Sequence, residues 1–347
     1  MHHQKQLTQL NTGNRKCWLD AIKGVAIILV ILSHTQTIPY VQYYLGACYM
    51  QLFFIASGYV YRDYAGSISR KWKQILVPYF SWSFFYLCNY TVYLCLTQFQ
   101  FWKIGVSIAG IFYSRFSLYT DYTSVSLMQF PLGASPLWFL TCMALAYLGF
   151  IPLLKAKGKW LILLILAYLA ISIAFMFCPI LLPWSLDTAF VAALLIYAGY
   201  RLKNISLSTA QYLCVLLACG IIYLFLVRIN SGINMSIREY GRWGILSVFI
   251  FILIGLLGTI CYSIFFMFIE KTKICRFFAY FGRMSLTIMC AHMFCVEIFE
   301  FLFEYFVGNI TLMHPLVLFF TRLIFVILMC MLIHHIILYV KRCLHRN

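Results

Sequence analysis

The sequence predicts an all-α membrane protein, a polytopic bundle of about ten transmembrane helices. Three observations support this fold class. The 347 residues are 64% hydrophobic and only 10% charged, with a mean hydropathy of +0.90, a composition far outside the range of soluble domains. The apolar runs have the length of helices, whereas the strands of an outer-membrane barrel are alternating segments of roughly ten residues. The stretches between the runs are short, so we expect one transmembrane domain over residues 1–347.

Ten apolar runs along the chain are predicted to cross the bilayer. They are 18–36, 42–61, 75–96, 136–154, 159–177, 187–202, 208–228, 243–268, 281–304 and 315–340. An even number of spans places both termini on one side. We expect that side to be the cytoplasm, with 1–17 and 341–347 as short tails, because most Lys and Arg residues then lie in cytoplasmic segments. The same rule explains the formal net charge of +17, because basic residues gather on the cytoplasmic side of a membrane protein. We therefore expect the lipid bilayer, and not nucleic acid, to be the partner of these charges.

The longest predicted connection, 97–135, is an outside loop rich in Tyr, Phe and Ser. A loop of this composition is expected to lie on the membrane interface or to cap a cavity. The 14 Cys residues lie mostly within apolar runs and form no CxxC pair. The sequence therefore predicts neither a disulfide framework nor a metal site.

The first span, WLDAIKGVAIILVILSHTQ, carries three residues that a bilayer disfavours, namely Asp20, Lys23 and His34. A charge near the bilayer centre costs about 3 kcal/mol or more, so such residues usually face a polar cavity or a partner. Lys23 and His34 are eleven residues apart, which on a helix is about three turns, or roughly 16 Å, and nearly the same face. One helix therefore presents a cation near one surface and a titratable imidazole toward the other.

This first span resembles the opening of the acyltransferase-3 family of integral membrane O-acyltransferases. That opening is a leucine–aspartate pair, a basic residue, ten other residues and a histidine, which here are Leu19, Asp20, Lys23 and His34. The usual basic residue is arginine. Lysine keeps a point charge but loses the bidentate grip of a guanidinium, and the fucose 4-O-acetylase-like branch is similar in using it.

Five further stretches are similar to family motifs and follow in the family's order over nearly the whole chain. They are 53–58 (FFIASG), 70–79 (RKWKQILVPY), 137–140 (LWFL), 197–200 (YAGY), and 281–286 (FGRMSL) followed by His292. The resemblance implies a multi-pass enzyme of the bacterial inner membrane. It implies transfer of an acetyl or other acyl group from cytoplasmic acyl-CoA to a hydroxyl of a sugar in a surface or exported glycan, possibly lipid-linked. Acetyl-CoA would be a co-substrate, and no bound cofactor is expected.

The catalytic candidates are His34, Lys23 and Asp20. Transfer from a thioester to a hydroxyl needs a base, and imidazole titrates near neutral pH, so we expect His34 to be the general base. The alternatives are an interfacial histidine that ends the helix and a covalent acyl-histidine intermediate. Lys23 and Asp20 are spaced i, i+3, so they either pair with each other or help to hold the acyl donor.

The donor-binding candidates are Arg62, Arg70, Lys71 and Lys73, which lie at the predicted cytoplasmic side. Acyl-CoA carries several phosphate charges and meets the protein there, although membrane orientation alone explains most of these cations. We expect Ser57 and Gly58 to permit close helix packing.

The acceptor-binding candidates are Trp138, Asp187, His292 and Glu297. Trp138 would stack on a sugar, or would anchor the fourth span at the interface. Glu297 forms a group of carboxylates with Glu300 and Glu304. The alternatives for that group are acceptor binding, raising the pKa of a catalytic histidine, and pairing with Arg242 or Arg322.

A rival prediction is a transporter or flippase for a polysaccharide or its lipid carrier, since intramembrane charges in a helix bundle would serve that function too. Transporters often contain inverted repeats with broken helices, and the sequence shows no internal repeat. A basic cytoplasmic surface with a single histidine at depth favours chemistry on a phosphorylated donor.

Overall fold

The computed structural model describes residues 16–35, 43–64, 66–97, 100–115, 117–120, 135–205, 207–306, 308 and 314–344. These residues contain helices and no strand, apart from two isolated bridges. Within this described part of the chain, seven helices are long and apolar enough to cross a membrane. They are α2 (Cys17–His34), α7 (Trp138–Lys155), α8 (Gly158–Met176), α10 (Thr209–Ile229), α11 (Leu246–Phe268), α12 (Lys273–Phe306) and α13 (Pro315–Leu344). The prediction of an all-α, multi-pass membrane protein is confirmed.

Four more α-helices and four short 3-10 helices complete the described fold. The α-helices are α4 (Tyr49–Tyr59), α5 (Ser67–Leu96), α6 (Phe101–Tyr113) and α9 (Leu186–Leu202), and the 3-10 helices are η1 (Gly46–Cys48), η2 (Ser135–Leu137), η3 (Pro183–Ser185) and η4 (Met235–Ile237). Each predicted span overlaps one of these α-helices, and the second span, 42–61, also includes η1 ahead of α4. The number of crossings and the side on which the termini lie stay predictions, and most of the two predicted tails lies outside the described residues.

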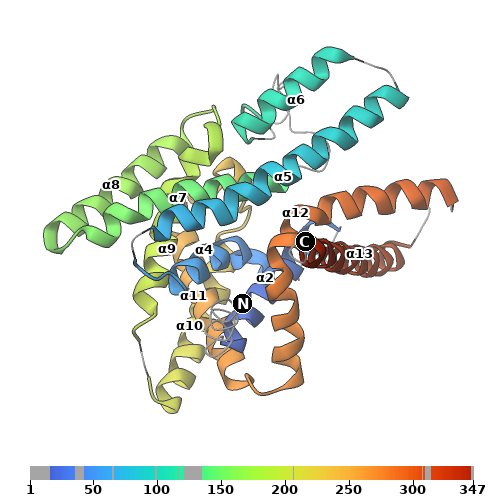
Figure 1. Cartoon of the computed structure of the whole chain (residues 1–347). Helices are drawn as coiled ribbons and strands as arrows, with labels where there is room; N and C mark the ends of the chain where they lie inside the picture. The colour runs from blue at the N-terminus through green and yellow to red at the C-terminus, as the bar shows by residue number, and fades with distance from the viewer. Residues whose placement is uncertain are drawn as a thin grey trace.

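The structure corrects the expected connection 97–135, because α6 occupies part of it. At 13 residues α6 is too short to cross a bilayer, so its apolar sequence does not stand out as a span. It runs back alongside α5 (Figure 1), and near its C-terminal end the Tyr79 hydroxyl of α5 donates to the Ile111 carbonyl oxygen at 2.5 Å. Residues 121–134 of the connection lie outside the described part of the chain.

The predicted starts of the spans 75–96 and 281–304 are also wrong. Polar residues precede each apolar run, and the helix includes them. Helix α5 begins at Ser67, so the basic run at 70–73 is helical and not part of a loop. Helix α12 begins at Lys273 and continues without a break through the predicted start at 281.

Helix α2 lies at the centre of the bundle (Figure 1), where 61% of it is buried, against 11% for the peripheral α8 and α10. Its main partner is α12, and the two helices touch through Gly24 and Gly282. A methyl group at either glycine would collide with the backbone of the other helix. Glycines at such a crossing let two helix backbones approach closely.

A second glycine pair joins α4 to α9. Methyl groups at Gly58 and Gly199 would meet the carbonyl oxygens of Ile196 and Ile55. The expectation that Gly58 permits close packing is confirmed, and its partner is the glycine of the YAGY motif at 197–200. The glycines of three motif stretches, 53–58, 197–200 and 281–286, therefore lie where two helices pack closely.

Both glycine-linked pairs run parallel. The Sγ atoms of Cys17 and Cys275 lie 3.6 Å apart where α2 and α12 begin, and the rings of His34 and His292 lie 5.1 Å apart further along. In α4 and α9 the last turns also meet, since Lys203 Nζ donates to the Tyr61 carbonyl oxygen at 3.3 Å. Parallel neighbours enter the membrane from one side, as the alternation of the predicted spans requires.

Candidate functional site

A cavity of about 590 Å³ opens at the C-terminal end of α2. Most of its wall comes from the last turns of α2, the segment from Tyr43 through η1 into α4, the start of α7, and the connection from α10 to α11, and α11 and α12 contribute one residue each. It is lined by Val30, Ser33, His34, Tyr43, Gly46, Ala47, Tyr49, Met50, Gln51, Pro136, Trp138, Val227, Asn230, Ser231, Gly232, Ile233, Asn234, Met235, Ser236, Phe251 and Met289. The predicted topology places this end of the bundle outside.

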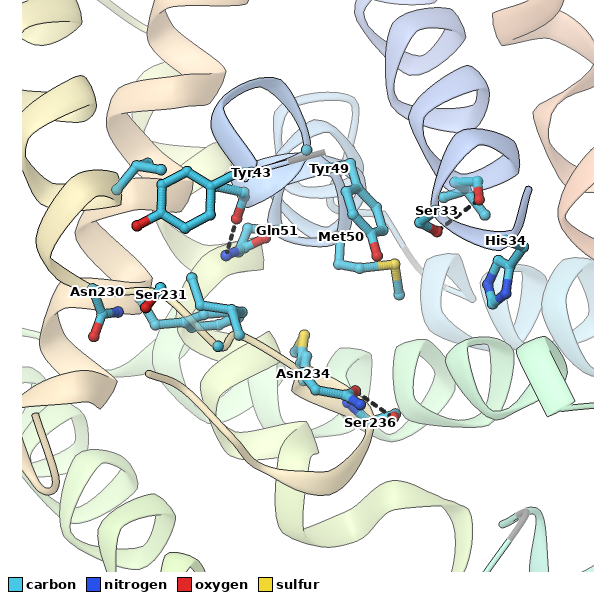
Figure 2. A pocket seen from close by; sticks show the side chains of 18 of the residues that line it. Ser33, His34, Tyr43, Tyr49, Met50, Gln51, Asn230, Ser231, Asn234 and Ser236 are labelled. Carbon is cyan, nitrogen blue, oxygen red and sulfur yellow. Dashed lines mark hydrogen bonds between the residues drawn. The ribbon is translucent and has the colours of Figure 1, made fainter. Parts of the chain in front are cut away.

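His34 is the one histidine among the described residues of this lining, and imidazole is the side chain most often used as a general base. It ends α2, its side chain is exposed, and Figure 2 shows the ring pointing into the space between α2 and the α10–α11 connection. An open imidazole at a cavity wall can accept a proton from a bound hydroxyl group.

His292 of α12 lies against His34 but is fully buried and does not line the cavity. Its Nδ1 atom lies 2.9 Å from the Ile288 carbonyl oxygen and 3.1 Å from that of Met289. Carbonyl oxygens only accept hydrogen bonds, so Nδ1 carries the proton and Nε2 presents a lone pair. That Nε2 atom is buried and has no hydrogen-bond partner among the described residues.

The wall opposite His34 contains several neutral polar side chains beside apolar ones (Figure 2). Asn230, Ser231, Asn234 and Ser236 come from the α10–α11 connection, and Gln51 comes from α4. Asn234 shapes this wall, since its Oδ1 atom accepts hydrogen bonds from the Ser236 hydroxyl at 2.6 Å and the Ser236 amide at 3.2 Å. Sequence reasoning did not select these residues, although a run of Asn, Ser and Gly between two apolar helices was a usable signal.

A buried ionic cluster supports this wall from behind. The Asp187 carboxylate pairs with the Arg115 guanidinium through one oxygen and with Arg238 at 2.6 Å through the other. Arg115 also donates to the Ser236 carbonyl oxygen at 2.5 Å and to that of Leu182 at 3.1 Å. The three charged side chains are buried, so the cluster ties three outer connections together without facing the cavity.

The α10–α11 connection has a defined backbone. Asn234 and Glu239 form a bridge with backbone hydrogen bonds of 2.7 and 3.0 Å. Between them Arg238 has φ = +64°, which is uncommon for a residue other than glycine. Its guanidinium, bound to Asp187 and to the carbonyl oxygens of Cys178 and Ile180, holds the backbone in this conformation.

Comparison with known proteins assigns the chain to a family. The model of the acyltransferase-3 family, described as an acyltransferase domain, matches residues 17–335. The chain belongs to the acyltransferase-3 family. It is therefore a membrane acyltransferase of this general kind. No curated protein and no solved structure matches the chain.

The histidine of the acyltransferase-3 opening lies at the cavity, but the acidic and basic residues of that opening do not. Asp20 is buried and Lys23 is half-buried, in the part of α2 that packs on α12. Neither residue lines the cavity. Lys23 and His34 are eleven positions apart on α2, which corresponds to roughly 16 Å along the helix.

The donor-binding candidates gather at the other end of α4. Arg62 follows α4, while Arg70, Lys71 and Lys73 lie in the first turns of α5. Lys71 is half-buried, and its ammonium lies over the Tyr147 ring, 5.9 Å from the centroid. The other three cations are exposed.

The acceptor-binding candidates do not form one group. Trp138 lines the cavity, whereas Asp187 belongs to the buried ionic cluster and His292 lies behind His34. Glu297 is half-buried on α12 away from the cavity lining. Its neighbour Glu300 pairs with Arg322 at 3.0 Å, which is one of the alternatives expected for the acidic group.

Proposed function

We propose that this acyltransferase moves an acetyl group from cytoplasmic acetyl-CoA to a sugar hydroxyl of a surface or exported glycan, at the bacterial inner membrane. The observation that carries this proposal is the exposed imidazole of His34 at the wall of a cavity lined by sugar-compatible polar groups. Family membership supplies the class of reaction.

In the proposed reaction His34 removes the proton of the acceptor hydroxyl. The hydroxyl oxygen attacks the thioester carbonyl carbon, the carbon–sulfur bond breaks, and the proton passes to the departing thiolate. The products are an ester and free CoA. General base catalysis of this kind contributes roughly 10²- to 10⁴-fold to the rate.

His292 acts in this proposal as a positioning residue for His34. Its Nδ1 atom is held by backbone carbonyl oxygens, so its Nε2 lone pair is fixed within the protein. A rotation of His34 that brings a ring N–H to this lone pair would leave the other ring nitrogen of His34 free to act as the base.

The acyl donor would bind with its phosphates at the cationic end of α4 and α5, near Arg62, Arg70 and Lys71. Helix α4 has 11 residues and is therefore about 16 Å long, which is a distance that the flexible arm of acyl-CoA can cover. The donor would meet the acceptor where α4 begins, beside His34.

The test is transfer of radiolabelled acetyl from acetyl-CoA by the purified protein in nanodiscs, with a panel of sugars. We expect His34→Ala to lower kcat by 10²-fold or more. His335→Ala is the matched control, because His335 is an exposed histidine on α13 that does not line the cavity. A fully active His34→Ala protein would refute the catalytic role. Failure of wild-type protein to bind any CoA species would favour the transporter instead.

A further inference from the structure

Among the residues that the structure describes, those that line the cavity carry no full charge at neutral pH besides any proton on His34. Its described lining contains amides, hydroxyl groups, aromatic rings and aliphatic side chains, but no Lys, Arg, Asp or Glu. We infer that the acceptor unit bound here is an uncharged sugar residue, and not a uronic acid, a sialic acid or a phosphorylated sugar. This inference rests on the proposed function and adds the substrate class.

The chemistry of the wall matches neutral hydroxyl groups. Amide and hydroxyl side chains both donate and accept, so they can pair with sugar hydroxyls in either direction. A carboxylate enclosed by the same groups would lose its water without gaining an ionic partner, which is strongly unfavourable. Trp138, Tyr43 and Tyr49 add aromatic surface on which the apolar faces of a sugar ring can pack.

The two buried arginines of the ionic cluster already bind other partners. Arg115 donates to Asp187 and to the carbonyl oxygens of Leu182 and Ser236. Arg238 donates to Asp187 and to the carbonyl oxygens of Ile180 and Cys178. Neither arginine lines the cavity, so the cluster holds the wall in place and adds no charge to the described lining.

The size of the cavity is consistent with this occupant. A volume of about 590 Å³ lies within the range of roughly 300–1,000 Å³ that is typical of small-molecule sites. The cavity can therefore hold a sugar residue, and a charged group on the side of that residue that faces the described lining would meet neutral side chains.

The experiment compares glycosides that differ only at C6. Methyl β-D-glucopyranoside and methyl β-D-galactopyranoside are paired with their uronates, in which a carboxylate replaces the C6 hydroxymethyl group. Acetyl transfer is measured with labelled acetyl-CoA, and acceptor binding is measured without donor by saturation-transfer NMR, with empty nanodiscs as background. We expect a preference of tenfold or more for at least one neutral glycoside over its uronate, in kcat/KM and in binding.

A charge-switch variant tests the site itself. Ser231 is half-buried in the neutral wall, so Ser231→Lys adds a cation to the cavity and should raise binding of the uronate relative to the neutral glycoside by tenfold or more. Thr209→Lys is the matched control, because it adds the same charge at the opposite, exposed end of α10.

The two readouts separate this inference from the proposed function. Neutral-selective binding without acetyl transfer would uphold the acceptor class and refute the acetyltransferase. Transfer to the uronate equal to or above that to the neutral sugar would uphold the acetyltransferase and overturn the inference. An absence of saturation transfer from every glycoside, or an unchanged preference in a folded Ser231→Lys protein, would also overturn it.

Discussion

Loss of the Asp187 charge should destabilise the protein far more than loss of an exposed charge nearby. The Asp187 carboxylate is fully buried and accepts hydrogen bonds from both Arg115 and Arg238. It also accepts from the backbone amides of Leu182 at 3.2 Å and Thr188 at 2.9 Å. An Asp187→Asn substitution keeps the shape of the side chain but leaves two guanidinium groups buried without an anion.

The magnitude follows from these contacts. A hydrogen bond to a charged group contributes about 1.5–3 kcal/mol, so the two guanidinium bonds together represent about 3–6 kcal/mol. Removing one partner from a buried ion pair costs about 3–5 kcal/mol in other proteins. We therefore expect Asp187→Asn to lower the free energy of unfolding by about 3–5 kcal/mol and the Tm by roughly 10 °C.

The assay is thermal unfolding in detergent, followed by the reaction of a thiol-specific fluorophore with cysteines that are buried in the native state, such as Cys142. Glu239→Gln is the matched control, because Glu239 is an exposed residue of the α10–α11 connection. We expect this control to change stability by less than about 1 kcal/mol. An Asp187→Asn protein that melts within about 1 °C of wild type would refute the reasoning. Normal melting together with a raised acceptor KM would instead support the acceptor role expected for Asp187.

Three further predictions concern helix packing, donor binding and the histidine pair. Gly24→Val should destabilise the contact of α2 with α12 by about 1–3 kcal/mol or more in the same assay, whereas Gly220→Val on α10, where a methyl group meets open space, should have little effect. Lys71→Met should raise the KM for acetyl-CoA about two- to fivefold at unchanged kcat. The control Lys103→Met on α6 should leave this KM unchanged. Equal effects of the two substitutions on the KM would argue against a donor site at α5. His292→Ala should lower kcat roughly tenfold and alter the acid limb of its pH profile, with acceptor KM unchanged; a raised KM and an unaltered kcat would assign it to acceptor binding.

Much of the fold was predictable because a bilayer imposes simple rules on a sequence. A spanning segment must be apolar and satisfy its backbone internally, so apolar runs translate directly into helices. The same rule failed for α6, because a helix of 13 residues is too short to span. It also misplaced the starts of α5 and α12, where polar residues end the apolar run but not the helix.

The candidate site was predictable only in part. His34 stood out because an ionisable residue in an apolar helix needs a polar neighbour. The wall opposite His34 is neutral, and neutral Asn and Ser residues in a connection are too common to mark a site. Asp187 was prominent for being a rare acidic residue, yet its charge is used to hold Arg115 and Arg238.

The sequence by itself determined that the chain is a helical membrane protein, that its first span carries an unusual imidazole, and that its motifs resemble those of the acyltransferase-3 family. Only the tertiary structure decided which residues face that imidazole. The close approach of Gly24 to Gly282 sets α2 against α12 and brings His292 to His34, while Asp187 draws the α10–α11 connection over the cavity. These contacts join segments that are far apart in the chain, so they depend on how helices pack and not on local composition.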